Sequence, residues 1–196
     1  PPPFRGMALV ASGSAQANQT ISNAALSERV ETNDEWIRTR TGIQSRRVSS
    51  PDESLNDLAI RAGLKALEMA QWEPDSLDLV LLATSTPDDL FGSAPRVQAG
   101  LKANNAVAFD LTAACSGFLF ALVTAAQYLR TGVMQRVLVI GADQLSRFVD
   151  WDDRSTCVLF GDGAGAVALE ATSSEADGLL GFRLRSDGSR GHSLTL

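Results

Sequence analysis

The sequence is poor in three residue types that commonly build functional sites. It has two cysteines, Cys115 and Cys157, one histidine, His192, and two lysines, Lys65 and Lys102. Two cysteines form no disulfide framework, and the absence of a CxxC or Cys/His cluster argues against a metal site. We therefore expect no metal cofactor and a reducing, cytoplasmic environment.

Long apolar runs and a basic surface are also missing. No run approaches the roughly 20 apolar residues of a membrane span, and residues 1–4 lack the charged and apolar regions of a signal peptide. The net charge is −6 and the pI is about 4.8, whereas proteins that bind nucleic acid or anionic membranes cluster basic residues against phosphates. The composition thus predicts neither nucleic-acid nor membrane partners.

The residues that are present predict a folded α/β protein. The 196 residues, of which 44% are hydrophobic and 20% charged, supply enough apolar material for the core of one large domain. Nearly continuous apolar strands alternate with helical patterns, which is typical of a layered α/β sheet. We expect strands over 7–13, 78–84, 106–111, 136–143, 166–170 and 179–185, and helices over 55–70, 94–102 and 115–130.

Capping patterns mark the starts of two helices. Thr32 and Glu35 match a capping box, which predicts a short helix ending at Gly42. Trp36 and Arg40 lie one turn apart on that helix and therefore share a face. Ser54 can cap the helix over 55–70, whose predicted apolar stripe comprises Leu55, Leu58, Ala62, Ala66 and Met69.

The helix predicted over 115–130 is apolar almost all round, which is typical of a helix buried in the middle of a protein. Cys115 lies at its start, where the helix dipole stabilises a thiolate and small neighbours leave room for a carbonyl group. Cys115 is thus a candidate nucleophile. The alternative interpretation is that Cys115 is a small apolar residue of the core. Cys157 is expected in the core, and His192 in a polar surface loop.

Two further clusters admit more than one interpretation. Arg38, Arg40, Arg46 and Arg47 could hold a phosphorylated ligand through bidentate hydrogen bonds, or could form a solvated loop. The glycines of 161–165 do not match a dinucleotide-binding motif, because they precede a strand instead of following one. We expect them to allow tight turns and close backbone packing.

Five segments together resemble β-ketoacyl-acyl carrier protein synthase III, in the order and spacing of that family: 32–43, 110–118, 153–156, 160–166 and 186–188. The resemblance implies a thiolase-like layered α-β-α half with a mixed, mostly parallel sheet and a buried central helix. It also implies that residues 1–196 form the N-terminal half of a duplicated architecture.

The resemblance assigns roles to individual residues. Cys115 matches the nucleophile that takes an acyl group from acetyl-CoA or another acyl-CoA, after which malonyl-acyl carrier protein is decarboxylated and its carbanion attacks the acyl thioester. The residues that match the coenzyme A subsite are Thr32, Trp36, Arg40 and Arg154. Those that match the acyl pocket are Phe91, Leu145 and Phe160. The position of Phe91 reaches the partner's site in the homodimers of this family.

The family also needs a histidine and an asparagine from a second half, which this sequence does not contain, and His192 does not match that histidine. Most of the docking surface for acyl carrier protein is expected in the second half too. Three functions therefore stay open. They are the initiation of fatty acid synthesis, an acyl-CoA ketosynthase of secondary metabolism, and a non-catalytic half that associates through its sheet edge.

Overall fold

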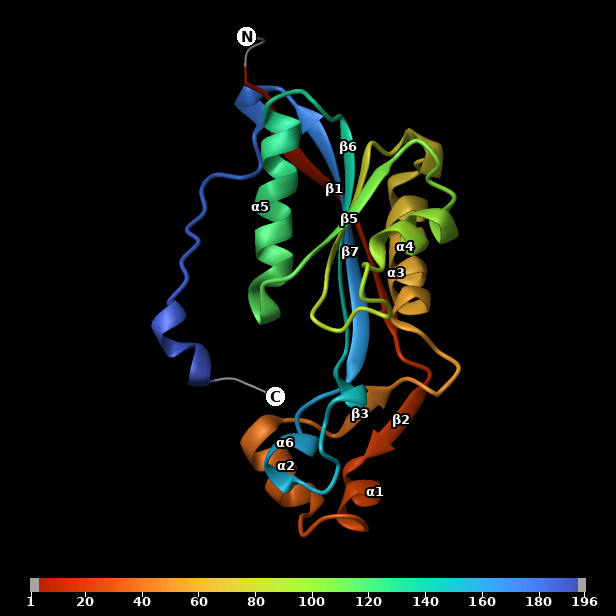
Figure 1. Cartoon of the computed structure of the whole chain (residues 1–196), viewed down its shortest axis with the longest axis vertical. Helices are drawn as coiled ribbons and strands as arrows, with labels where there is room; N and C mark the ends of the chain where they lie inside the picture. Colours follow the sequence, from red (N-terminus) through yellow and green to blue (C-terminus); the bar gives the residue numbers. More distant parts are fainter. Residues whose placement is uncertain (1–3, 194–196) are drawn as a thin grey trace.

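The computed structural model describes residues 4–193 and is built on one five-stranded sheet (Figure 1). The strand order is β1-β7-β6-β4-β5. β4 is parallel to β5 and β6, whereas β7 is antiparallel to β1 and β6, so only β7 runs against the others. This confirms the mixed, mostly parallel sheet. The strands are β1 (Gly6–Gln16), β4 (Leu79–Ala83), β5 (Val107–Leu111), β6 (Arg136–Gln144) and β7 (Asp162–Thr172).

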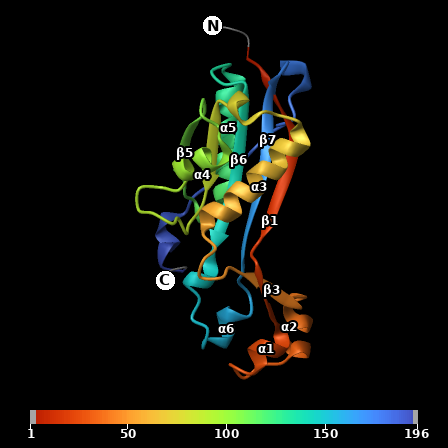
Figure 2. The same cartoon turned by 90° about the vertical axis from the view of Figure 1, so that its right-hand side faces the viewer.

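Helices cover both faces of this sheet, and we call the sheet with these helices the body. α3 (Leu55–Ala70) and α4 (Ala94–Leu101) lie on one face, and α5 (Gly117–Arg130) lies on the other (Figures 1 and 2). Each face has its own apolar cluster, because alternate side chains of β4 and β6 point to opposite sides. All five residues of β4 are buried, as predicted for a strand covered on both faces.

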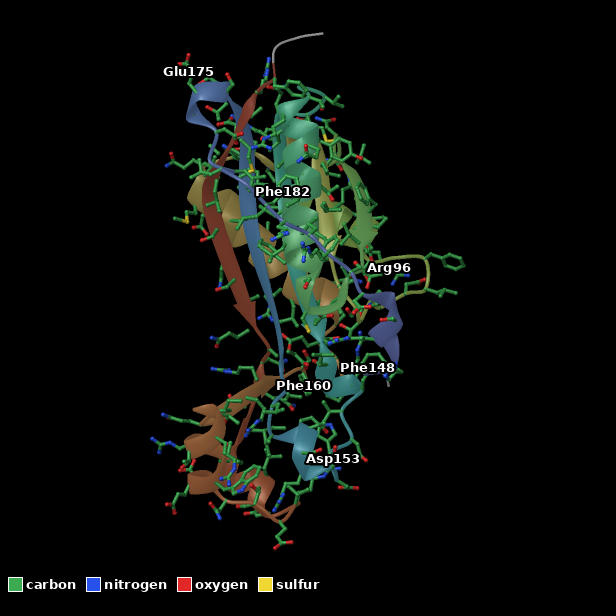
Figure 3. All side chains as sticks on the ribbon, turned by 90° about the vertical axis from the view of Figure 1, so that its left-hand side faces the viewer. Arg96, Phe148, Asp153, Phe160, Glu175 and Phe182 are labelled. Carbon is green, nitrogen blue, oxygen red and sulfur yellow. The ribbon has the colours of Figure 1, made fainter. Side chains whose placement is uncertain are left out.

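α5 is buried on its sheet side only. Its buried residues include Ala121, Ala125 and Leu129, but Leu119 on another side is 58% exposed. In Figure 3 the C-terminal segment with Phe182 crosses in front of this helix. Because Phe182 is itself 53% exposed, that segment does not seal the helix. In the described chain the helix therefore covers one face of the sheet, and its outer apolar side is partly open to solvent instead of buried all round as predicted.

A small lobe extends from the end of the sheet (Figure 1). Its two short strands pair antiparallel, and its apolar centre consists of four buried residues, Leu26, Ile37, Cys157 and Val158. The sequence patterns predicted only one of its elements, the short helix before Gly42. The lobe comprises β2 (Gln19–Ser22), α1 (Asn23–Ser27), α2 (Asp34–Thr41), β3 (Ser45–Val48) and α6 (Arg154–Cys157).

The capping predictions have different outcomes. The hydroxyl of Ser54 accepts from the amide of Asp57, and the Asp57 carboxylate accepts from the Ser54 amide, which confirms the cap of α3. The Thr32 cap of α2 is wrong, because Asn33 is the N-cap and its side chain accepts from the Trp36 amide at 2.8 Å. Asparagine caps at least as well as threonine, so the start moves by one residue.

Three other expectations need correction. Met69 is 65% exposed and lies outside the buried stripe of α3. Residues 179–185 form no strand, since after the bond from the Gly178 amide to the Met7 carbonyl this stretch pairs with no neighbouring strand of the described chain. β7 begins at Asp162, so the glycine-rich stretch lies largely within the strand. Short 3-10 turns span Pro74–Ser76, Ala114–Ser116, Leu145–Arg147, Ser174–Ala176 and Gly188–Ser193.

None of the helices within residues 4–193 is both long enough and apolar enough to cross a membrane.

Candidate active site

Cys115 lies on a strained turn between β5 and α5. Residues Ala114–Ser116 form a 3-10 turn, and α5 begins directly after it at Gly117. Ala114 has a φ of +47°, a left-handed conformation that costs an alanine about 1–2 kcal/mol. Strain of this kind persists only where the surroundings fix it, and it clusters at functional sites. The turn holds the Cys115 side chain exposed instead of packing it into the core.

The thiol of Cys115 opens into a hollow of about 300 Å³. A methyl group built on Gly165 would meet no atom within 4 Å, so this glycine borders open space. The small residues of β6 and β7 therefore leave room in front of the sulfur, a function of the glycine-rich stretch that the sequence reasoning missed. The lining residues are Ala83, Ala114, Cys115, Phe118, Gly141, Ala142, Asp143, Gly161, Gly163, Ala164 and Gly165.

Close packing explains another of these glycines. A methyl group on Gly161 would lie 2.7 Å from the carbonyl oxygen of Arg47, which is closer than real Cβ contacts allow. The predicted role in close backbone packing is therefore confirmed at Gly161, where the chain presses against β3.

Three lobe residues from the resemblance come together around one indole ring. The guanidinium carbon of Arg40 lies 4.5 Å from the centre of the Trp36 ring, and that of Arg154 lies 5.0 Å from it. The shared face of Trp36 and Arg40 is thus confirmed. Arg154 also donates to the carbonyl of Glu31 at 2.8 Å, which ties α6 to the segment before α2. The result is a half-buried indole beside two exposed guanidinium groups, a flat cationic surface able to stack a planar anionic ligand.

The lobe and Cys115 lie at the same end of the sheet. Figure 1 shows that the first turn of α5 and the carboxyl end of β6 point toward the lobe, and β4 runs parallel to β6. In Figure 3, Phe160 lies at the junction between body and lobe, and Asp153 lies within the lobe. Ligands of α/β sheets commonly bind outside the carboxyl ends of strands, which suits a ligand that extends from Trp36 toward Cys115.

The remaining residues from the resemblance are more scattered. The hydroxyl oxygen of Thr32 is buried without a hydrogen-bond partner among the described residues. Leu145 opens the turn after β6, and Phe160, 37% exposed, precedes β7. Phe91 is 92% exposed and lines a separate hollow of about 570 Å³ beside β5. The structure thus does not place Phe91 in the hollow of Cys115.

The four clustered arginines do not form one patch. Arg38 pairs with Asp34 at 3.5 Å, Arg40 covers Trp36, and Arg47 is exposed. Arg46 is instead 5% exposed, which neither interpretation of the cluster predicted.

The other two candidates lie where the sequence placed them. Cys157 is buried, and this burial raises the pKa of its thiol. His192 is exposed in a short 3-10 turn. Within the described range 4–193, no group of three or more His, Cys, Asp or Glu side chains could hold a metal ion.

The sheet with helices on both faces and an exposed cysteine just before α5 has a thiolase-like fold. The family model of 3-Oxoacyl-[acyl-carrier-protein (ACP)] synthase III matches residues 109–188. Over these residues the chain is similar to the family of β-ketoacyl-acyl carrier protein synthase III. It is 75% identical over its whole length to "Beta-ketoacyl-[acyl-carrier-protein] synthase III" from Synechococcus sp. (strain WH7803), of which it spans 57%.

Solved structures agree with this assignment. The synthase III from Pseudomonas aeruginosa PAO1 aligns with a TM-score of 0.89 at 41% identity, covering 95% of this chain and 58% of that one. The priming β-ketosynthase of the R1128 polyketide pathway aligns with a TM-score of 0.85 at 37% identity, covering 91% and 53%. The chain therefore spans somewhat more than half the length of the relatives that it matches.

Proposed function

We propose that the protein to which this chain belongs starts fatty acid synthesis by condensing acetyl-CoA, or another acyl-CoA, with malonyl-acyl carrier protein. One observation carries the proposal: Cys115 is exposed on a strained turn, in front of a hollow lined by small residues. A core cysteine needs neither strain nor space. A nucleophile that must admit a thioester needs both.

The first step is acyl transfer to Cys115. Its thiolate attacks the carbonyl carbon of the acyl-CoA thioester, a new carbon–sulfur bond forms, and the bond to the coenzyme A sulfur breaks. The coenzyme A thiolate leaves and is protonated, and the acyl group stays on Cys115 as a thioester. In the second step, malonyl-acyl carrier protein loses carbon dioxide, and the resulting carbanion displaces Cys115 from the acyl group. We propose that a histidine and an asparagine for this step come from the part of the relatives' length beyond this chain.

The lobe supplies the proposed coenzyme A subsite. Trp36 stacks the adenine, Arg40 and Arg154 complement the phosphates of coenzyme A, and Thr32 belongs to the segment just before α2 that Arg154 contacts through the Glu31 carbonyl. Leu145 and Phe160 line the acyl end, and Phe91 completes the acyl pocket of a partner in a homodimer. The exposure of Phe91 beside the edge strand β5 supports that assembly. Both cysteines are free, which supports a cytoplasmic location.

A second candidate is a ketosynthase that primes secondary metabolism. The structural likeness to the R1128 priming β-ketosynthase favours it, at 37% identity. The 75% identity to a synthase III favours the first proposal. Rates of Cys115 acylation with acetyl-, branched and longer acyl-CoA separate the two, because pocket size decides chain preference.

Intact-protein mass spectrometry after incubation with acetyl-CoA tests the proposal. We expect one acetyl group to be added to the wild-type chain and to Cys157→Ala, and none to Cys115→Ala. Acetylation that survives in Cys115→Ala would refute the assignment of the nucleophile. If the chain takes no acetyl group, the same test on a protein of the relatives' full length decides between a non-catalytic half and a structural Cys115.

A further inference from the structure

A buried hydrogen-bond chain crosses the lobe from α6 to α2. The two terminal nitrogens of Arg46 donate to the Val158 carbonyl at 2.6 Å and to the Asn23 side-chain oxygen at 2.8 Å. The Asn23 amide nitrogen donates in turn to the Asp34 carboxylate at 2.8 Å and to the Ile43 carbonyl at 2.7 Å. Arg46 is 5% exposed and Asn23 1%. We call Arg46 and Asn23 the brace.

The ends of the brace coincide with the elements that carry the Trp36 surface. Val158 is the C-cap of α6, the helix that opens with Arg154. Asp34 is the first residue of α2, the helix that carries Trp36 and Arg40. Through three hydrogen bonds, the brace therefore connects the two helices whose spacing determines how Arg154 sits over Trp36, and a fourth bond holds Ile43 just after α2.

Burying the charged guanidinium of Arg46 costs free energy, so a role in stability alone does not explain it. Both of its side-chain hydrogen bonds go to neutral oxygens, and its Nε finds no partner among the described residues. Burial disfavours the charged form and lowers the pKa of the guanidinium, and the neighbouring Cys157 offsets this only in part. Apolar residues of similar volume often stabilise a protein as well as a buried charge does. What an apolar side chain cannot supply is a rigid fork that reaches two oxygens on different segments.

We propose that Arg46 and Asn23 are positioning residues of the coenzyme A subsite, which hold α2 and α6 at the spacing that places Arg154 over Trp36. The inference rests on the proposed function for the identity of the ligand. The placement of Arg154 over Trp36, which the inference explains, exists without any ligand. Neither residue touches the stacking surface. Each acts through the helix that it holds.

A double-mutant cycle, followed by fluorescence quenching of Trp36, tests the brace without any ligand. In a Trp72→Phe, Trp151→Phe background, Trp36 is the only tryptophan, and acrylamide quenching reports how well the guanidinium groups cover it. We expect Arg46→Met to raise the quenching constant about as much as Arg154→Met does, and the double variant to raise it no further, because both changes remove the same contact. Arg46→Lys, which keeps the charge but has no fork, should behave like Arg46→Met.

Titration of the chain with coenzyme A tests the functional consequence. We expect Arg46→Met to raise the dissociation constant roughly tenfold, the loss typical of one misplaced cation–π and phosphate partner. Arg136→Met is the matched control, because Arg136 stacks on Trp72 at 4.7 Å outside the lobe, and it should leave coenzyme A affinity unchanged.

The outcomes separate the two proposals. The proposed positioning role would be overturned, whatever the ligand, by either of two results. One is that the effects of Arg46→Met and Arg154→Met on the quenching constant add up in the double variant. The other is that Arg46→Met has the same quenching constant as the wild type. If a protein of the relatives' full length binds no coenzyme A while the cycle remains non-additive, the proposed function is refuted and the brace still stands.

Discussion

The body and the lobe are held together by different means, although they form one chain. The body buries long apolar side chains on both faces of its sheet, among them Leu81, Leu138 and Ile140. The lobe has four buried residues at its apolar centre and fills much of the rest with arginine, tryptophan and a buried asparagine. Burial of apolar surface thus stabilises the body, whereas directional polar contacts give the lobe its shape. The body presents the nucleophile, and the lobe presents the surface proposed to bind coenzyme A.

The largest expected effect on stability is in the body. Leu138 is fully buried on β6, so Leu138→Ala leaves a cavity and should lower the free energy of unfolding by about 2–5 kcal/mol. The same truncation in the lobe, Leu26→Ala, should cost less than half as much in global unfolding, because so small a cluster can open by itself. Urea unfolding followed by circular dichroism measures both. Equal losses would mean that the lobe is part of the same cooperative core.

The next effect belongs to the lobe and concerns binding. Trp36→Ala removes the stacking surface, and stacking on an aromatic residue contributes about 1–3 kcal/mol, so coenzyme A affinity should fall about 5- to 150-fold. Trp72→Ala removes a tryptophan that also stacks on an arginine, but outside the lobe, and should leave affinity unchanged. Isothermal titration measures both variants. Comparable losses in the two would place the ligand elsewhere.

A smaller effect is expected where the body itself is strained. Ala114→Gly removes the cost of φ +47°, and we expect a gain in unfolding free energy of up to about 1 kcal/mol after the greater chain entropy of glycine is subtracted. Acetylation of Cys115 should slow, because the turn is then free to move the thiol. Faster acetylation would contradict the idea that the strained turn positions the nucleophile.

Sequence reasoning succeeded in the body and largely failed in the lobe for the same reason. Strand and helix periods report apolar burial, so β4, β6, α3 and α4 could be predicted to within about two residues. The paired strands of the lobe have only four residues each, with arginines at two positions, and no periodicity reveals such elements. The prediction that Trp36 and Arg40 share a face held, because helix geometry fixes it locally.

Other features depended on contacts that no local pattern contains. Asn33 and Thr32 are both good caps, and only the fold selects Asn33. The burial of Arg46 requires Val158, which lies 112 residues away. The apolar stretch 179–185 has the composition of a strand, but no neighbouring strand accepts it in the described chain.

The smallest expected effect is a pH-dependent ion pair in the body. Burial alone would raise the pKa of the Asp177 carboxyl, but hydrogen bonds from the amides of Met7 and Leu179 and the guanidinium of Arg130 outweigh it and lower that pKa. A lowered pKa means stability that is fully present above the ordinary aspartate pKa of about 3.9 and is lost as pH falls through the lower, folded value. Asp177→Asn should therefore reduce the free energy of unfolding by about 1 kcal/mol or less between pH 5 and 8.

The difference between Asp177→Asn and wild type should begin to narrow as the pH falls below about 3.9, and it closes as the pH passes through the lower, folded pKa of Asp177. Urea unfolding at pH 7, 5, 4 and 3 follows this convergence. Asp152→Asn is the lobe control: it breaks the exposed pair with Arg29, and exposed pairs contribute so little that the change should stay within about 0.5 kcal/mol. A difference at Asp177 that does not narrow at all as the pH falls from 5 to 3 would show that the amide-bonded geometry, and not the charge, ties β1 to the end of α5.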